Sequence, residues 1–286
     1  MIQPLQQGHT LIEEIEQSEC PAPRLWWLGQ SGFVVKYHQI VFYIDPYLSD
    51  SVAARFSALD LKASRERLTE APLRPWQVRH ADLVLCTHHH DTHMDEQTLR
   101  PMLNASRRAR LVLPKSAAGR AYSFGIDYQR MTTTDADLRV EYFKNGDYGR
   151  IYAIPSAHEG LDYTPVGGYP YLGYLIRFGE YTIYHAGDCV PYEGLVDRLR
   201  PYNVTVALLP INGRDPARGV PGNFFIEEAA QLAADIGAQW LVPMHYDMFA
   251  FDTVDVNRFV DHMLFSRPAQ RFKVFQCGES WAIPEE

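Results

Sequence analysis

The sequence predicts an α/β protein in which two β-sheets carry helices on their outer faces. Short, continuously apolar runs recur along the chain, as in residues 25–28, 33–35 and 40–44. Such runs are typical of strands that are buried on both faces. Amphipathic segments with helical spacing are spread between these runs. A pair of sheets with helices outside would bury the strands on both sides.

Composition indicates a globular protein. The 286 residues are 46% hydrophobic and 22% charged, which excludes a disordered chain, a coiled coil and a collagen-like repeat. Length alone favours two domains at ~150 residues each. No linker or repeat marks a boundary, however, so we predict a single domain over residues 1–286. Within it, residues 1–22 form an N-terminal extension and residues 50–80 an insertion loop.

The net charge limits the kinds of partner that the protein can bind, and the cysteine spacing indicates its redox compartment. Lys and Arg number 27 against 35 Asp and Glu, a net charge of −8, so no basic face for nucleic acid is apparent. No apolar run approaches the ~18–20 residues of a membrane span, and residues 1–10 do not resemble a secretory signal. The four cysteines are widely spaced and form no CxxC pair. We expect a cytoplasmic protein with reduced thiols and no nucleic-acid or membrane partner, and leave open a homo-oligomer.

Elements of the first half alternate between strands and short helices. The polar, Arg-rich residues 50–80 predict a short helix and a long loop. Asp95 is a suitable N-cap for a following helix, which Pro101 would interrupt or kink. A further helix is predicted over 116–124, ended by Gly125. Besides the three apolar runs above, strands are predicted at 81–86 and 110–113.

The second half repeats this pattern. Phe225, Ala229, Leu232 and Ile236 lie on one helical face, and Asn223 can cap the start of that helix. A last amphipathic helix is predicted around 256–264. Strands are predicted at 138–143, 149–154, 172–178, 181–185, 204–209 and 240–242, with closing strands at 272–275 and 281–283.

A histidine cluster directly follows the predicted strand 81–86. Four of the 11 histidines lie between positions 88 and 93. His88 and His90 are two residues apart, so on an extended backbone their rings leave the same face, whereas His89 leaves the opposite face. His93 comes from the turn beyond. Imidazole is the usual nitrogen ligand for zinc and similar divalent ions, although this segment alone is also compatible with a surface histidine tract.

Three later strands end in further candidate ligands. His158 follows one strand, Asp188 follows another within His-Ala-Gly-Asp, and His245 follows a third. Histidine or aspartate at the ends of four separate strands is how a site at one sheet edge is assembled. The sequence therefore predicts a metal site at such an edge.

The pattern HxHxxH after a strand, then a lone His, a Gly-Asp and a final His, resembles that of the metallo-β-lactamase-fold hydrolases. Residues 26–29 (Trp-Trp-Leu-Gly), 43–46 (Tyr-Ile-Asp-Pro), 185–188 and 243–247 are similar to the L-ascorbate-6-phosphate lactonase-like branch. The resemblance covers about residues 24 to 284. It implies a four-layer αββα sandwich with a metal site at the sheet edge.

The resemblance also implies a set of ligands, carried over position by position. Asp45 would orient ligand imidazoles by hydrogen bonding. The site would hold one or two divalent ions, zinc or manganese, with iron also suited to histidine and carboxylate. The ligands fall into two sets: His88, His90 and His158 for a first ion, and His93, Asp188 and His245 for a second, with Asp188 bridging the two.

One position departs from the resemblance. The family pattern has aspartate where this chain has Thr92, and Asp91 lies one residue early. Asp91 could replace the missing carboxylate, the second site could be weak, or catalysis could be lost. Because Asp91 on an extended backbone points away from the His88/His90 face, we favour a weakened second site. Asp91 or Asp188 would have to act as the catalytic carboxylate that steers the water and the proton.

The implied chemistry is hydrolysis. A divalent ion lowers the pKa of bound water toward ~7, and the resulting hydroxide attacks an ester, lactone or phosphoester while the ion stabilises the oxyanion. The resemblance implies a small anionic lactone or ester, including phosphorylated sugar lactones. Arg214 and Asn212 are candidates to bind the anionic group, although Asn-Gly is also a turn signal. Tyr246 flanks His245 and is expected to line the cleft. The alternatives are a small-molecule phosphodiesterase and a catalytically degenerate metal-binding protein.

Overall fold

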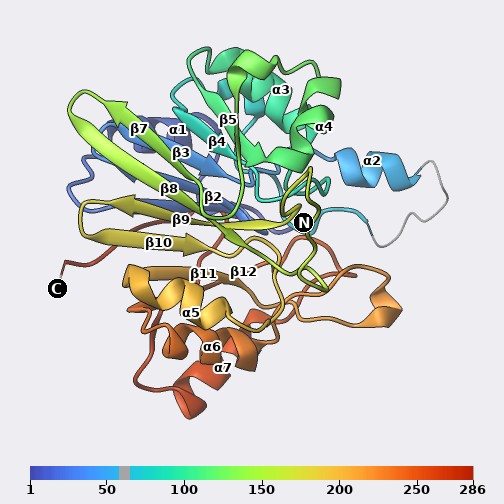
Figure 1. The fold of residues 1–286 in the computed structure, drawn as a ribbon, viewed down its shortest axis with the longest axis vertical. Helices are drawn as coiled ribbons and strands as arrows, with labels where there is room; N and C mark the ends of the chain where they lie inside the picture. Colours follow the sequence, from blue (N-terminus) through green and yellow to red (C-terminus); the bar gives the residue numbers. More distant parts are fainter. Residues whose placement is uncertain (58–64, 286) are drawn as a thin grey trace.

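The computed structural model describes residues 1–57 and 65–285 and has four layers (Figure 1). Two seven-stranded sheets lie face to face. Helices α1, α3 and α4 cover the outer face of one sheet, and α5, α6 and α7 cover the outer face of the other. The predicted αββα sandwich is therefore confirmed. Residues 58–64, within the predicted insertion loop, lie outside the described residues.

The first sheet has the order β14-β1-β2-β3-β4-β5-β6. Its strands β3 to β6 run parallel to one another, whereas β14, β1, β2 and β3 pair antiparallel. The strands are β1 (Arg24–Gly29), β2 (Gly32–Tyr37), β3 (Ile40–Ile44), β4 (Leu83–Leu85), β5 (Arg110–Pro114), β6 (Met131–Thr134) and β14 (Ser280–Ala282).

The second sheet has the order β13-β12-β11-β10-β9-β8-β7. Here β7 to β10 pair antiparallel and β10 to β13 run parallel. The strands are β7 (Arg139–Lys144), β8 (Asp147–Pro155), β9 (Leu172–Phe178), β10 (Tyr181–His185), β11 (Val206–Pro210), β12 (Trp240–Met244) and β13 (Arg271–Phe272).

Most of the helices form the two outer layers of the sandwich, and α2 lies apart from them at one edge (Figure 1). No helix within residues 1–57 and 65–285 is long and apolar enough to cross a membrane. The α-helices are α1 (Gly8–Gln17), α2 (Ser51–Ser57), α3 (Glu96–Ala105), α4 (Ala118–Ser123), α5 (Leu195–Leu199), α6 (Ile226–Asp235) and α7 (Val256–Ser266).

Alternation along each strand of the first sheet divides its side chains between two cores. In β1, Leu25 and Trp27 belong to the core between the sheets, whereas Trp26 and Leu28 belong to the core beneath α1, α3 and α4. Because both faces are buried, the central strands here are apolar at nearly every position. This is why the runs were recognisable in the sequence although they lack the period of two.

Several elements differ from the sequence expectations. Helix α3 begins at its predicted N-cap, Asp95, but continues through Pro101 instead of stopping there. Asn223 does not cap α6; its side chain accepts from the main-chain N–H of Cys189. Strand β6 was not predicted, and β13 is shorter than the predicted strand at 272–275.

The first 22 residues are integrated with the first sheet. Helix α1 buries Leu11, Ile12 and Ile15, and the Lys36 ammonium on β2 donates to the main-chain carbonyls of Ile15 and Glu16 at 2.7 and 2.8 Å. The segment that was expected to be an extension thus forms part of the outer helical layer.

Candidate metal centre

The ends of strands from both sheets meet around one carboxylate. Asp188, which follows β10, is 5% exposed and faces four imidazoles. Its Oδ2 atom lies 3.3 Å from Nε2 of His158, 3.5 Å from Nε2 of His245 and 4.0 Å from Nε2 of His88. Its Oδ1 atom lies 3.4 Å from Nε2 of His93. The structure therefore brings these five predicted ligands into one buried cluster.

Two overlapping groups in this cluster have the spacing of metal ligands. His88, His90 and His158 form one group, and His88, His93 and Asp188 form the other. Within each group the ligand atoms lie within 4.8 Å of one another. His245 approaches Asp188 but lies outside both groups. Histidine nitrogen together with carboxylate oxygen suits zinc, manganese and iron alike.

Hydrogen bonds on the far side of the imidazoles fix which nitrogen faces the centre. Asp45, at the end of β3, accepts from His93 Nδ1 at 2.7 Å and from the Thr87 hydroxyl at 2.6 Å. Because that hydroxyl has already donated its proton, it accepts from His88 Nδ1 at 3.0 Å. Nδ1 of His158 donates to the Gly222 carbonyl at 2.9 Å. In all three histidines Nε2 is left as the nitrogen that faces Asp188.

These inward atoms fit a divalent cation. Nε2 of His88, Nε2 of His93 and Oδ1 of Asp188 are fully buried and have no hydrogen-bond partner. A buried polar atom without a partner costs free energy comparable to a lost hydrogen bond. Three such atoms converging on one point, each with a lone pair directed inward, are satisfied together by a cation.

Electrostatics leave part of the cluster neutral. Burial, together with neighbouring histidines, lowers the pKa of His88 well below its usual value and the pKa of His90 to about 3. Burial acts the same way on His93, but the carboxylates of Asp188 and Asp45 outweigh it and raise the His93 pKa to about 10. Burial also opposes ionisation of Asp188, yet His93, with two other histidines, holds the Asp188 pKa well below its usual range.

The backbone around the centre is held in uncommon conformations. Gln30, Asp45 and His245 have positive φ values of 48°, 42° and 68°, which non-glycine residues rarely adopt. Such conformations persist only where the surrounding structure enforces them, and they are concentrated at functional sites. At Gly187, before Asp188, a Cβ atom would lie 2.8 Å from the carbonyl oxygen of Leu172, so only glycine fits there.

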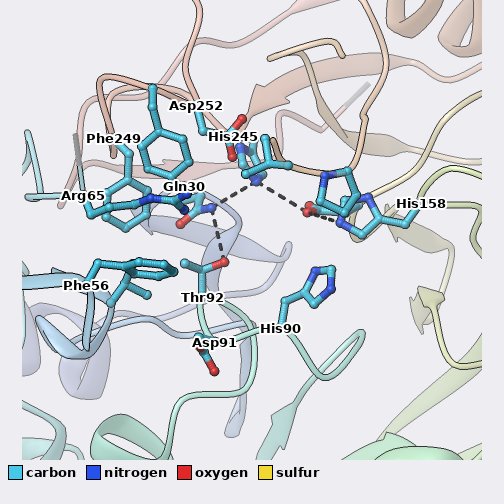
Figure 2. A pocket seen from close by; sticks show the side chains of 15 residues that line it. Gln30, Phe56, Arg65, His90, Asp91, Thr92, His158, His245, Phe249 and Asp252 are labelled. Atoms are coloured by element: carbon cyan, nitrogen blue, oxygen red, sulfur yellow. Dashed lines mark hydrogen bonds and ion pairs between the residues drawn. The ribbon is translucent and has the colours of Figure 1, made fainter. Parts of the chain in front are cut away.

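Gln30 is a site residue that the sequence reasoning missed. Its side-chain amide nitrogen lies 3.0 Å from His245 Nε2 and 3.4 Å from the Thr92 hydroxyl (Figure 2). Its main-chain carbonyl accepts from the N–H of His245 at 3.0 Å and from Trp27 Nε1 at 2.9 Å. The sequence places Gln30 in the short turn between the predicted strands 25–28 and 33–35 and indicates no role for it. A polar, non-glycine residue inside that turn was the available signal.

Asp91 lies where the extended-backbone argument put it, away from the metal-ligand face. Its carboxylate accepts from Arg55 Nη1 on α2 at 2.5 Å and from Arg120 Nη2 on α4. Figure 2 shows it pointing away from His158 and His245. With both oxygens held by arginines, Asp91 does not reach the cluster, and its assignment as a catalytic carboxylate is corrected.

A cleft of about 200 Å³ opens onto the cluster. His90, His158, Asp188 and His245 line its metal-ligand end. The other walls are largely apolar and are formed by Val52, Phe56, Val220, Pro221, Phe249 and Phe251. Among the described residues, they also carry one arginine, Arg65. The cleft therefore combines a polar end and an apolar wall.

The three residues predicted to contact substrate lie outside this cleft. Arg214 makes a two-pronged ion pair with Glu228, at 2.6 and 2.7 Å. The Asn212 amide donates to Asp252 at 2.7 Å, behind the cleft wall. Tyr246 is 1% exposed and its hydroxyl donates to a main-chain carbonyl at 2.6 Å. All three are corrected, because their polar groups are already paired within the protein.

Comparison with known proteins identifies the family. Residues 41–246 match the β-lactamase superfamily domain, so the chain belongs to this superfamily. It is 25% identical over 246 residues to a mitochondrial N-acyl-phosphatidylethanolamine-hydrolyzing phospholipase D from Saccharomyces cerevisiae, covering 84% of this chain but only half of the yeast protein. It is 22% identical over 307 residues to a probable L-ascorbate-6-phosphate lactonase from Escherichia coli, covering 97% of this chain and 86% of the relative.

A solved structure supports the fold independently. A metallo hydrolase from Ignicoccus hospitalis superposes with a TM-score of 0.66 at 21% identity, covering 93% of this chain and all of that one. The fold, the ligand cluster and the relatives agree that this chain is a metal-dependent hydrolase of the β-lactamase superfamily. The predicted resemblance, including the lactonase-like relatives, is confirmed.

Proposed function

We propose that this metal-dependent hydrolase cleaves a small ester or lactone that carries an anionic group on an apolar body. The observation that carries the proposal is Arg65 in the cleft wall, beside the metal-ligand cluster. Among lactones, phosphorylated sugar lactones are one candidate class, supported by the name of the Escherichia coli relative. The apolar wall favours a less hydroxylated body.

Arg65 is suited to bind an anion at this position. Its guanidinium carbon lies 4.3 Å from the centre of the Phe56 ring and 4.0 Å from that of Phe251. Stacking between two aromatic faces orients the planar group and partly removes it from water, which strengthens its attraction for a carboxylate or phosphate. Burial lowers the pKa of Arg65, but arginine remains cationic at neutral pH.

The reacting end of the cleft is polar. A divalent ion bound there would supply a Lewis acid and a source of hydroxide near neutral pH. Three carboxylates line the cleft among the described residues: Asp91, Asp188 and Asp252. Asp91 is held by two arginines, and Asp252 accepts from Asn212 and Arg218. Asp188 is therefore the carboxylate we assign to hold the ion and to orient the nucleophile.

The experiment compares charged and neutral substrates of equal size. The zinc-loaded and manganese-loaded proteins are tested on an alkyl lactone with a carboxylate, on its methyl ester, and on a phosphorylated sugar lactone. We expect turnover of the anionic lactone, and Arg65→Ala should raise its KM about tenfold or more without changing the KM of the neutral ester. Arg214→Ala is the matched control, because that arginine lies outside the cleft, and both KM values should be unchanged.

Two results would overturn the proposal. An equal rise in KM for the anionic and the neutral substrate in Arg65→Ala would mean that the arginine supports the fold and does not bind the anion. Bound metal without turnover of any ester or lactone would favour the degenerate metal-binding alternative.

Phosphodiester hydrolysis is the second candidate. The yeast relative is named as a phospholipase D, which supports this candidate, and Arg65 beside an apolar wall would also suit a phosphodiester with an apolar group. A bis-aryl phosphodiester in the same assays distinguishes the two: faster turnover of the phosphodiester than of every ester and lactone would replace the leading proposal.

A further inference from the structure

Gln30 has a side-chain amide whose hydrogen bonding is incomplete. The residue is 2% exposed, and its Oε1 atom is buried without a partner. Its Nε2 atom lies 3.0 Å from His245 Nε2, the nitrogen that also faces Asp188 at 3.5 Å. An amide directed at a cation-binding cluster, with its only strong acceptor unused, is expensive to bury unless a ligand satisfies it.

The spacing of this amide matches that of a ligand. Neighbouring donor atoms around a zinc ion with bonds of ~2.0–2.2 Å are separated by roughly 3–3.5 Å. The terminal amide atom of Gln30 has this separation from His245 Nε2. A half-turn of the amide about its terminal bond exchanges Nε2 with Oε1 and brings the acceptor to that position.

The backbone of Gln30 holds the side chain in place. Its φ of 48° is an unfavourable conformation for a residue with a side chain. Its carbonyl is fixed by Trp27 Nε1 and by the N–H of His245. The same peptide thus anchors both Gln30 and His245, and couples the turn after β1 to the end of β12.

Other side chains near this position do not provide an oxygen. Asp91 is paired with Arg55 and Arg120. Thr92 has a hydroxyl that stays protonated, and it contacts the Gln30 amide at 3.4 Å. Asp252 accepts from Asn212 and Arg218. This leaves Gln30, among the described residues, as the further oxygen donor next to His245 besides Asp188.

We propose that Gln30 is a metal ligand in this chain. Its amide oxygen completes a second cation position with His93, Asp188 and His245, beside the position of His88, His90 and His158. Because an amide is neutral, the second position carries less negative charge than one completed by a carboxylate. The second ion therefore binds more weakly than it would at a position completed by a carboxylate. The proposal concerns metal binding and does not depend on the substrate.

The test counts ions and measures their affinities without using catalysis. The chelator-stripped full chain is titrated with Zn²⁺ by calorimetry and with Co²⁺ by visible absorption. The wild type should bind two ions in separate steps. Gln30→Ala should weaken the second step by about tenfold or more and leave the first within twofold. Gln30→Glu should tighten the second step by a similar factor, because it restores a carboxylate.

Asp91→Asn is the matched control, since it alters the neighbouring carboxylate without touching Gln30. Both binding steps should be unchanged in this variant. The proposal is overturned if the wild type binds one ion only, or if Gln30→Ala and Gln30→Glu both keep the wild-type second step. Loss of the second step in Asp91→Asn would overturn it in favour of Asp91. If Gln30→Ala does not fold, as judged by circular dichroism, Gln30→Glu decides the question because it preserves the side-chain length.

Discussion

At the scale of single residues, hydrogen-bond direction decides which nitrogen of each histidine faces the centre. The Thr87 hydroxyl donates its proton to Asp45 and therefore accepts from His88 Nδ1. The direction of this one hydroxyl thus fixes which nitrogen of His88 faces the centre. His90 lacks such a partner among the described hydrogen bonds and is half-buried. It is nevertheless within ligand spacing of His88 and His158. Its contribution to metal binding is therefore best tested by removal.

His90→Ala should abolish binding of one ion per chain. The reason is that the group of His88, His90 and His158 would retain only two imidazoles, too few for tight binding of a zinc ion. Elemental analysis after dialysis against micromolar zinc measures the loss. His89→Ala is the matched control, because the neighbouring His89 belongs to neither ligand group. Unchanged metal content in His90→Ala would disprove the ligand assignment.

The raised pKa of His93 predicts how the metal-free protein responds to pH. Its folded-state pKa is about 10, against an ordinary value of 6.5. A raised pKa stabilises the folded state fully below the unfolded value, and this stabilisation is lost as the pH rises toward the folded value. The free energy of unfolding of the chelator-stripped protein should therefore fall between pH 7 and pH 10, as measured by urea denaturation.

Asp45→Asn provides the comparison for this pH effect. Removing one of the two carboxylates that raise the His93 pKa should flatten the decline between pH 7 and pH 10. An equal decline in both proteins would assign the effect to other groups.

At the scale of elements, the positions of site residues at strand ends could be predicted from the sequence, whereas those of site residues in long loops could not. His88, His158, Asp188 and His245 follow strands whose apolar runs mark where each one ends, so their convergence could be inferred. Arg65 lies in the segment after α2, where no periodicity indicates a direction. Its position depends on contacts with residues far away in the chain.

Arg67 holds the segment that carries Arg65. Its guanidinium is 2% exposed and donates to the main-chain carbonyls of Tyr47, Ser49 and Thr69 at 2.9–3.1 Å. Its backbone forms a β-bridge with Phe249 of the cleft wall. Three main-chain carbonyls thus depend on one buried side chain.

Arg67→Ala should destabilise the zinc-loaded protein by about 2–4 kcal/mol, because it leaves buried carbonyls without donors. Arg55→Ala is the control: that arginine is 65% exposed and pairs only with Asp91 among the described ion pairs, so the loss should stay below about 1 kcal/mol. Urea denaturation measures both. Similar small losses in the two variants would show that Arg67 does not anchor the segment.

At the scale of the whole molecule, the metal centre joins the two sheets. Asp45, His88 and His93 follow strands of the first sheet, whereas His158, Asp188 and His245 follow strands of the second. The sequence indicated that ligands come from both halves of the chain, because candidate ligands follow predicted strands in each half. The residues alone could not reveal that the ligands of the two halves face one another across the sheet interface. Only the family resemblance implied it, through an Asp188 that bridges two ions.

A ligand that binds only the folded state stabilises it in proportion to its concentration above Kd. Zinc at 100 times its Kd should therefore add about 2.7 kcal/mol and raise Tm by roughly 5–10 °C for a domain of this size. Because the first ion is held by residues of both sheets, His90→Ala in the first sheet and His158→Ala in the second should each remove its share of the shift and leave only that of the second ion. Calorimetric scans with zinc and with chelator measure it. An undiminished shift in either variant would mean that the first ion does not depend on both sheets, contrary to the arrangement around Asp188.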